Sequence, residues 1–284
     1  MSALKTTKNQ LISQLFWQME IGVDDAILAE PSWQEQMVSR KEYFATFEKS
    51  RELGSVPKKS ISDFSNFEKT IGSFETSTAK LKNTSSNLNK KNKLDSITTL
   101  KELRTAIELF SGCGLKNTAN HFVFSDGNPD AKIMIIGEAP GKEEDKIGTP
   151  FVGQAGQLLD KMLNSVGLDR NCVYITNYIP WRPPGNRTPS QEEIGILKPF
   201  VIRHIQLKKP AIILALGGVA AKALLEVETG ILKLRGQIQH KNFGLKHTIP
   251  VLPTLHPAYL LRAPAQKKFA FADFVALKRA FLSI

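Results

Sequence analysis

This chain of 284 residues has little of what marks secreted or membrane proteins. Its two cysteines, Cys113 and Cys172, cannot make a disulfide framework, so a reducing interior is the default expectation. The longest apolar runs, such as residues 212–216, are strand-length, whereas a membrane helix needs about 20 residues. No apolar signal-peptide core follows the first methionine. We therefore expect a cytoplasmic protein with no membrane partner.

Two well-known nucleotide-binding loops are also missing. Neither G-x-G-x-x-G nor G-x-x-x-x-G-K-[ST] occurs, so the glycine-rich loop near residue 140 does not by itself indicate a nucleotide site. Positive charge, in contrast, is abundant: the net charge is +11 and the pI is near 9.6. A basic face would attract a polyanion, but a merely lysine-rich composition explains the charge equally well.

The chain divides into three parts by composition. Residues 1–54 are predicted to form a helical N-terminal extension, because Leu11, Leu15 and Met19 repeat at helical spacing. Residues 55–95 are polar and basic without an apolar period, which predicts a disordered linker. Residues 96–284 carry regular patterns and are expected to form the functional domain.

Strand and helix patterns alternate along this domain. The strand-like runs are 131–137, 173–177, 211–217 and 249–255. The helical segments between and around them are 97–109, 154–166, one that starts at the capping pair Ser190 and Glu193, one ending near 226, and 266–282. This alternation predicts an α/β fold, a three-layer α/β/α sandwich around a mostly parallel four-stranded sheet. Ligands of such sheets bind beyond the carboxyl ends of the strands.

Three segments at those strand ends carry the polar side chains. The first runs from Gly137-Glu138-Ala139-Pro140-Gly141 through Gly148-Thr149-Pro150-Phe151-Val152-Gly153. The second begins at Thr176-Asn177 and continues through residues 182–189. The third is His256-Pro257-Ala258-Tyr259-Leu260-Leu261-Arg262. Together they resemble the uracil-DNA glycosylase superfamily, most closely its family 4, from about residue 105 to the C-terminus.

The resemblance implies an enzyme that hydrolyses the N-glycosidic bond of uracil in DNA. The product would be an abasic site, which starts base excision repair. The implied partner is uracil-containing DNA, and we expect a monomer. Two alternatives remain open: a nucleic-acid-binding module that kept the fold and lost catalysis, and an unrelated α/β enzyme acting on a free nucleotide.

The resemblance also implies roles for individual residues. Phe151 would stack on the flipped uracil, and the Asn177 amide would match uracil O4 and N3–H and reject cytosine. Ala139 lies in the base pocket, at the position where the best-known uracil glycosylases carry an aspartate. His256 would donate a hydrogen bond near O2 of the departing uracil anion, and backbone N–H groups near Glu138 and Ala139 could add to that site.

The water and DNA contacts are less settled. Glu138 and Glu144 are the available carboxylates for the attacking water, and Asn186 matches a functional family position. Glu138 could instead hold the loop, so the water-activating residue stays open. The loop after His256 should press Leu260, Leu261 and Arg262 into the duplex. The expected phosphate contacts are Arg182, Arg187, Lys267 and Lys268, each of which could also be an ordinary surface charge.

The sequence departs from family 4 at its iron-sulfur cluster. Cys113 matches one ligand of the leading cysteine pair, and Phe110 occupies the other position. The remaining ligand positions fall near Trp181 and Leu197, both apolar, and Cys172 lies at none of them. One thiolate cannot hold a cluster that needs about four. We expect no cofactor and no metal, with Phe110, Trp181 and Leu197 as a small apolar core.

Overall fold

The computed structural model describes residues 94–283. The expected helical extension at 1–54 and almost all of the expected linker at 55–95 lie outside the described residues. The domain expected at 96–284 falls almost entirely within them. Among the described residues, no helix is both long enough and apolar enough to cross a membrane.

Six strands form one sheet in the described part of the chain, in the order β1-β3-β2-β4-β6-β5. Their bounds are β1 Ser125–Gly127, β2 Ile133–Gly137, β3 Val173–Asn177, β4 Ile212–Leu216, β5 Gln239–Lys241 and β6 Ile249–Thr254. The neighbours β3, β2, β4 and β6 run parallel to one another, and β1 and β5 pair antiparallel at the two edges.

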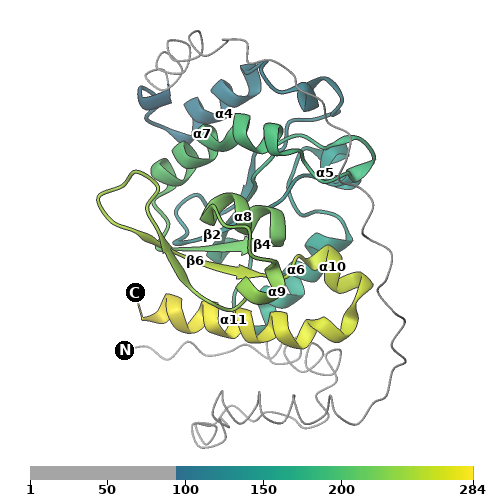
Figure 1. The fold of residues 1–284 in the computed structure, drawn as a ribbon, viewed down its shortest axis with the longest axis vertical. Coiled ribbons are helices and arrows are strands. Elements are labelled where there is room, and N and C mark those ends of the chain that lie inside the picture. Colours follow the sequence, from purple (N-terminus) through teal and green to yellow (C-terminus); the bar gives the residue numbers. More distant parts are fainter. Residues whose placement is uncertain (1–93, 284) are drawn as a thin grey trace, which may run out of the picture. The chain divides into compact units, whose positions relative to one another are not determined.

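Helices cover both faces of the sheet (Figure 1). On one side lie α4 (Leu100–Leu109), α7 (Gln191–Lys208) and α8 (Gly218–Leu225), and on the other α6 (Gln154–Ser165), α10 (Pro257–Arg262) and α11 (Lys267–Leu282). The remaining described helices are α5 (Lys142–Ile147), α9 (Ile231–Leu234), and the 3-10 turns η2 (Gly114–Asn117), η3 (Arg170–Cys172), η4 (Pro184–Asn186) and η5 (Pro264–Gln266).

The layers follow from how buried side chains alternate along each strand. Met134 and Ile136 of β2 join the apolar core beneath α4, α7 and α8, while Ile133 and Ile135 join the core beneath α6, α10 and α11. The strands are therefore apolar at nearly every position, as expected for parallel strands covered on both faces. The three-layer fold and the four parallel strands are confirmed.

Two details of the elements extend the predictions. The sheet has two further strands, β1 and β5, which the sequence does not announce because they are three residues long and half-buried or exposed. The predicted start of α7 is confirmed: the Ser190 side chain accepts from the Glu193 N–H, and the Glu193 carboxylate accepts from the Ser190 N–H at 2.7 Å.

Candidate active site

The strand register brings the three polar segments to one edge of the sheet. Gly137, the last residue of β2, is paired with Asn177, the last residue of β3. Leu216 at the end of β4 is paired with Thr254 at the end of β6, and His256 follows two residues later. All four parallel strands end on this side, so residues far apart in sequence meet there as the sequence predicted.

Asn177 and Phe151 meet directly above Gly137. A Cβ on Gly137 would lie 2.4 Å from Asn177 Oδ1 and 2.6 Å from Phe151 Cζ, so only glycine leaves room for both side chains. Asn177 Oδ1 is buried, and no described residue donates a hydrogen bond to it. Buried polar atoms are almost always paired in folded proteins. Among the described residues, this oxygen is thus a buried acceptor without a donor.

His256 completes a small group around this acceptor. The rings of Phe151 and His256 are 5.8 Å apart between centroids and tilted by 32°. On its other side His256 packs against Gly217, where a Cβ would come within 3.0 Å of the His256 Cβ. Gly217 also has a φ of +91°, which glycine tolerates best. The glycine at the end of β4 thus allows the His256 side chain to pack closely against the backbone there.

The protonation state of His256 follows from its surroundings. Burial, with a smaller contribution from the positive charge of Arg262, lowers its pKa to about 4. The imidazole is therefore neutral at physiological pH. Its Nδ1 accepts a hydrogen bond from the Ala258 N–H at 3.2 Å, so Nε2 carries the proton. His256 can donate from Nε2 to an acceptor in the site.

Glu138 and Glu144, the two carboxylates considered for the water, have different surroundings. Glu138 is half-buried, and desolvation raises its pKa above the usual range. Glu144 is buried, and its oxygens accept from three backbone N–H groups: Gly141 at 3.1 Å, Val152 at 3.0 Å and Gly153 at 2.8 Å. Glu144 thus ties the loop after β2 to the loop that carries Phe151. This use of both oxygens favours a loop-holding role for Glu144 and leaves Glu138 as the stronger candidate for the water.

Asn186 lies in an exposed turn with a positive φ of 56°. Its side-chain oxygen accepts from Arg182 Nε at 2.7 Å, which turns the amide NH₂ away from the arginine. Arg182 also lies 3.9 Å from a carboxylate oxygen of the buried Asp145. Arg182, expected as a phosphate contact, therefore already has two protein partners.

The expected DNA-facing residues after His256 do not share one environment. Leu260 is fully buried in the core beneath α6, α10 and α11, whereas Leu261 is 43% exposed. The expectation for Leu260 is corrected accordingly: on α10 the two neighbours point in different directions, and of the two only Leu261 is exposed. Arg262 is exposed at the end of the same helix. Arg187 is exposed and pairs with both oxygens of Glu193, at 2.9 and 2.6 Å.

Three residues near the site are not evident from the sequence. Gly137 has the pattern of an ordinary strand end, although the space it leaves is what lets two ligand-facing groups meet. Asp145 is buried and accepts from Asn120 and His121 backbone N–H groups. Arg170 donates a hydrogen bond to the backbone carbonyl oxygen of Phe151. No local motif distinguishes the last two from surface charges, because their partners lie far away in sequence.

Comparison with known proteins identifies the family. The model of the uracil DNA glycosylase superfamily matches residues 124–277, which include every strand-end residue described above. The chain belongs to the uracil-DNA glycosylase superfamily. Within this superfamily it is similar to type-4 enzymes, and the expected family is confirmed.

Three type-4 uracil-DNA glycosylases show the extent of the likeness. The protein from Pyrobaculum aerophilum is 39% identical over 171 residues, covering 58% of this chain and 86% of its own length. That from Thermotoga maritima is 41% identical over 153 residues, 54% of this chain and 78% of its own. That from Saccharolobus solfataricus is 41% identical over 178 residues, 60% of this chain and 81% of its own.

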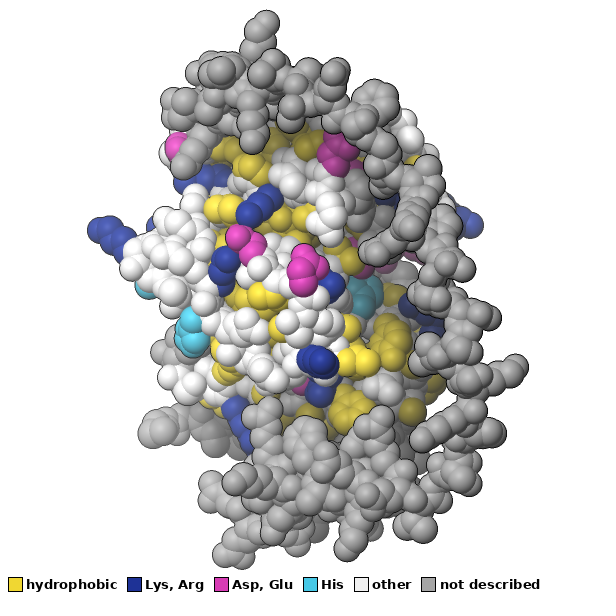
Figure 2. Space-filling model, in the orientation of Figure 1, with side chains coloured by type: hydrophobic (Ala, Val, Ile, Leu, Met, Phe, Trp, Pro, Cys, Tyr) yellow, Lys and Arg dark blue, Asp and Glu magenta, His cyan; other side chains and the backbone are white. Residues whose placement is uncertain are grey.

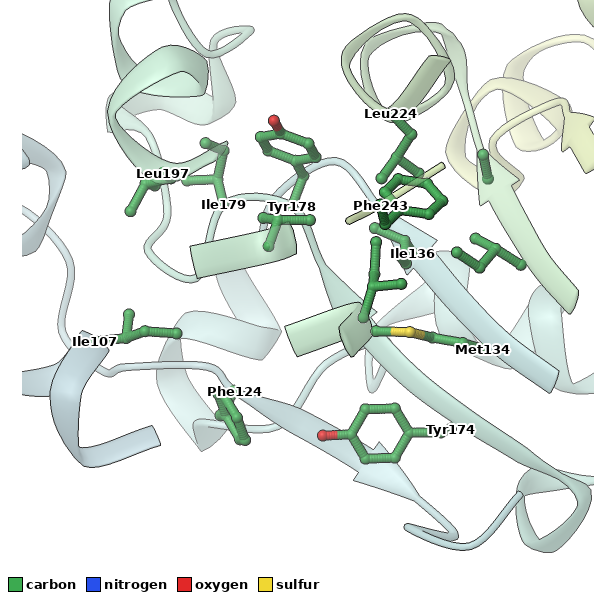
Figure 3. Close-up of a cluster of buried hydrophobic side chains, with 14 of the residues drawn as sticks. Ile107, Phe124, Met134, Ile136, Tyr174, Tyr178, Ile179, Leu197, Leu224 and Phe243 are labelled. Atoms are coloured by element: carbon green, nitrogen blue, oxygen red, sulfur yellow. The ribbon is translucent and has the colours of Figure 1, made fainter. Parts of the chain in front are cut away.

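The residues expected at the family 4 cluster positions lie in an apolar core. Cys113, Trp181 and Leu197 are each at most 2% exposed and belong to one core cluster, with Phe110 packed against it. Figure 3 shows Leu197 in this core with Tyr178 and Ile179. Burial raises the pKa of the Cys113 thiol, which favours its neutral form over the thiolate that binds metal.

The second cysteine cannot complete a ligand set there. Cys172 is exposed and lies just before β3, whereas Trp181 follows the opposite, carboxyl end of that strand. With one neutral thiol among apolar side chains, the residues present do not fit an iron-sulfur cluster.

Proposed function

We propose that this chain hydrolyses the N-glycosidic bond of uracil in DNA, releasing free uracil and leaving an abasic site. One observation carries the proposal: the buried, unpartnered Asn177 Oδ1 beside the Phe151 ring. Uracil flipped out of the duplex would donate its N3–H to this oxygen and accept at O4 from the Asn177 amide NH₂. Cytosine has no proton at N3 and a donor in place of O4, so it would leave buried groups unpaired.

Departure of the base needs a donor for the negative charge that develops on uracil. His256 supplies it, because its neutral imidazole presents Nε2–H while Nδ1 is occupied by the Ala258 N–H. A neutral donor already fixed in place stabilises the anion as it forms and needs no reorganisation. Ala139 lies half-buried in the same loop as Glu138, where its small side chain leaves room for the base.

The second step is addition of water to the sugar. Glu138 is the carboxylate with capacity for this role, since burial raises its pKa and Glu144 is occupied by backbone N–H groups. Asn186, oriented by Arg182, assists from the neighbouring turn. Leu261 and Arg262 fill the gap in the duplex and contact its phosphates, with Arg187, Lys267 and Lys268 as further basic groups near the DNA.

The enzyme works without an iron-sulfur cluster. The support is the donor set itself: two cysteines in the whole chain, of which one, Cys113, belongs to the apolar core at the cluster positions. Iron analysis and visible absorption of anaerobically purified protein test this directly. We expect no stoichiometric iron and no charge-transfer absorption, while a stoichiometric cluster would refute the proposal.

The setting is base excision repair in the cytoplasm, with the protein acting as a monomer on DNA. The free thiols of Cys113 and Cys172 fit a reducing compartment.

A uracil-containing oligonucleotide tests the function. After incubation with the protein, alkali should cut the strand at the uracil position, and free uracil should appear in the supernatant. The same oligonucleotide with thymine or cytosine at that position should stay intact. No cleavage of either single- or double-stranded uracil DNA would refute the proposed activity.

A further inference from the structure

Phe151 is held in a backbone conformation that a bulky side chain seldom adopts. Its φ is +55°, in the left-handed region that disfavours residues with a large Cβ substituent. Such a residue persists only where its surroundings enforce the conformation. The chain approaches closely here as well: a Cβ on Gly156 would lie 1.8 Å from the Phe151 carbonyl oxygen. The aromatic ring proposed to stack on the base therefore belongs to a residue with a strained backbone conformation.

Arg170 contacts the backbone carbonyl groups at Phe151. Its NH2 group donates to the Phe151 carbonyl oxygen, and its NH1 group lies 3.5 Å from the Pro150 carbonyl oxygen. The N–H groups that follow Phe151, those of Val152 and Gly153, are bound by Glu144. Side chains of Arg170 and Glu144 thus bind the backbone at Phe151 and directly after it.

Arg170 is itself anchored to two other elements. Its Nε donates to Asp160 of α6 at 2.8 Å, and its NH1 pairs with Asp126 of β1. All three guanidinium nitrogens therefore have protein partners. The residue opens η3, directly before β3, whose far end carries Asn177. A planar fork fixed at two carboxylates is well suited to hold two neighbouring carbonyl groups.

We propose that Arg170 is a positioning residue for base recognition, which keeps Phe151 in its left-handed conformation so that the ring is preorganised for the flipped uracil. The inference rests on the proposed glycosylase function. Arg170 acts through Phe151 and does not touch the base. Without the guanidinium, the Phe151 backbone relaxes toward negative φ. The ring position that suits uracil binding then becomes a minority conformation.

The size of the effect follows from the population of the competent state. Apparent affinity falls in proportion to that population. Loss of the hydrogen bonds that keep one residue in the left-handed region corresponds to a decrease of about 10- to 100-fold in kcat/KM. The loss should fall on the affinity for uracil-containing DNA, since general DNA binding does not use the base pocket.

The chain offers a matched control for the loss of an arginine. Arg203 also donates to distant backbone carbonyls, those of Ile97 at 3.0 Å and Asp95 at 3.1 Å, on the opposite helical layer. Arg170→Met and Arg203→Met each remove a guanidinium that binds distant backbone carbonyls, but only Arg170→Met also removes ion pairs, those with Asp126 and Asp160. Thermal unfolding of both variants, together with Arg170→Lys, measures the purely structural cost. Lysine keeps the charge for Asp126 and Asp160 but lacks the fork, and it also provides the test should Arg170→Met not fold.

The measurements are single-turnover uracil release and binding to DNA carrying a 2′-fluoro-deoxyuridine, which resists cleavage. We expect Arg170→Met and Arg170→Lys to lower kcat/KM and 2′-fluoro-deoxyuridine affinity about 10- to 100-fold, with thymine-DNA affinity unchanged. Arg203→Met should match the wild type in all three. In a Phe151→Leu background, which lacks the ring, the Arg170 substitution should have little further effect.

Three results would overturn the inference: equal behaviour of the Arg170 and Arg203 variants, equal loss of affinity for uracil and thymine DNA, or full additivity with Phe151→Leu. Wild-type protein that releases no uracil is a different outcome, because it refutes the proposed function first.

Discussion

His256 shows how burial at a single residue sets its chemical role. The pKa of an ordinary histidine, near 6.5, would leave a mixture of charged and neutral rings close to physiological pH. Burial lowers the pKa of His256 to about 4, and the Ala258 N–H fixes the tautomer. The ring is therefore a neutral donor throughout the physiological range, which is the state that its proposed role beside the leaving uracil requires.

This lowered pKa predicts how stability depends on pH. The unfolded chain takes up a proton at this residue below about pH 6.5, but the folded protein does so only near 4. The contribution to stability is thus complete above pH 6.5 and is lost as pH falls toward 4, by at most about 3 kcal/mol. Urea unfolding of wild type and His256→Asn at pH 5 and 7 measures it, and the variant should lose less stability at pH 5.

Other titrating residues cancel in that comparison. His204, whose pKa burial lowers to about 3, and Asp273, whose pKa burial raises to about 6, are present in both proteins. The same change in stability between pH 5 and 7 for the two proteins would show that His256 titrates normally in the folded state.

Glu138 and Glu144, in the segment between β2 and α6, are proposed to have different tasks. Glu144→Gln removes one of the oxygens that serve three N–H groups, so buried donors lose partners at a cost of about 1–3 kcal/mol. Glu138→Gln removes a negative charge from a side chain to which we assign no comparable structural role. We expect Glu144→Gln to unfold at lower temperature and Glu138→Gln to keep the wild-type melting temperature while losing about 10²-fold in single-turnover rate.

A near-normal rate for Glu138→Gln, together with normal stability for Glu144→Gln, would mean that Glu138 does not handle the water and that Glu144 does not hold the loop.

Two neighbouring leucines of helix α10 also differ in their surroundings and are expected to differ in their roles. Leu260→Ala should destabilise the fold by about 2–5 kcal/mol, because Leu260 is fully buried. Leu261→Ala should leave stability unchanged and slow uracil release from double-stranded DNA more than from single-stranded DNA, since only the duplex has a gap to fill. An equal fold-loss on single- and double-stranded DNA for Leu261→Ala, relative to wild type, would contradict the wedge role.

These elements also show what sequence can and cannot predict. The four parallel strands and the segments after them follow from apolar runs ending in glycine, asparagine or histidine, so the site's place at the strand ends was predictable. The edge strands β1 and β5 were not, since Ser-Asp-Gly and Gln-His-Lys carry no strand pattern. Leu260 and Leu261 are identical neighbours, and only the orientation of α10 separates them.

At the scale of the whole molecule, the described residues form two apolar cores on the faces of the sheet, and the proposed site lies at the sheet's carboxyl edge. One core lies under α4, α7 and α8 and includes Cys113, Trp181 and Leu197, and the other lies under α6, α10 and α11. The net charge of +11 suits a DNA partner. On the described part of the face in Figure 2, basic side chains are scattered among acidic and apolar ones, without one large basic patch.

At the carboxyl edge of the sheet, Asn177 is the residue proposed to recognise uracil. The most direct test compares single-turnover uracil release by wild type, Asn177→Ala and the exposed control Asn117→Ala, with thymine-DNA affinity measured alongside. We predict a loss of about 10²-fold for Asn177→Ala alone, with thymine-DNA affinity unchanged in all three. Wild-type rates from Asn177→Ala would contradict this account of the site.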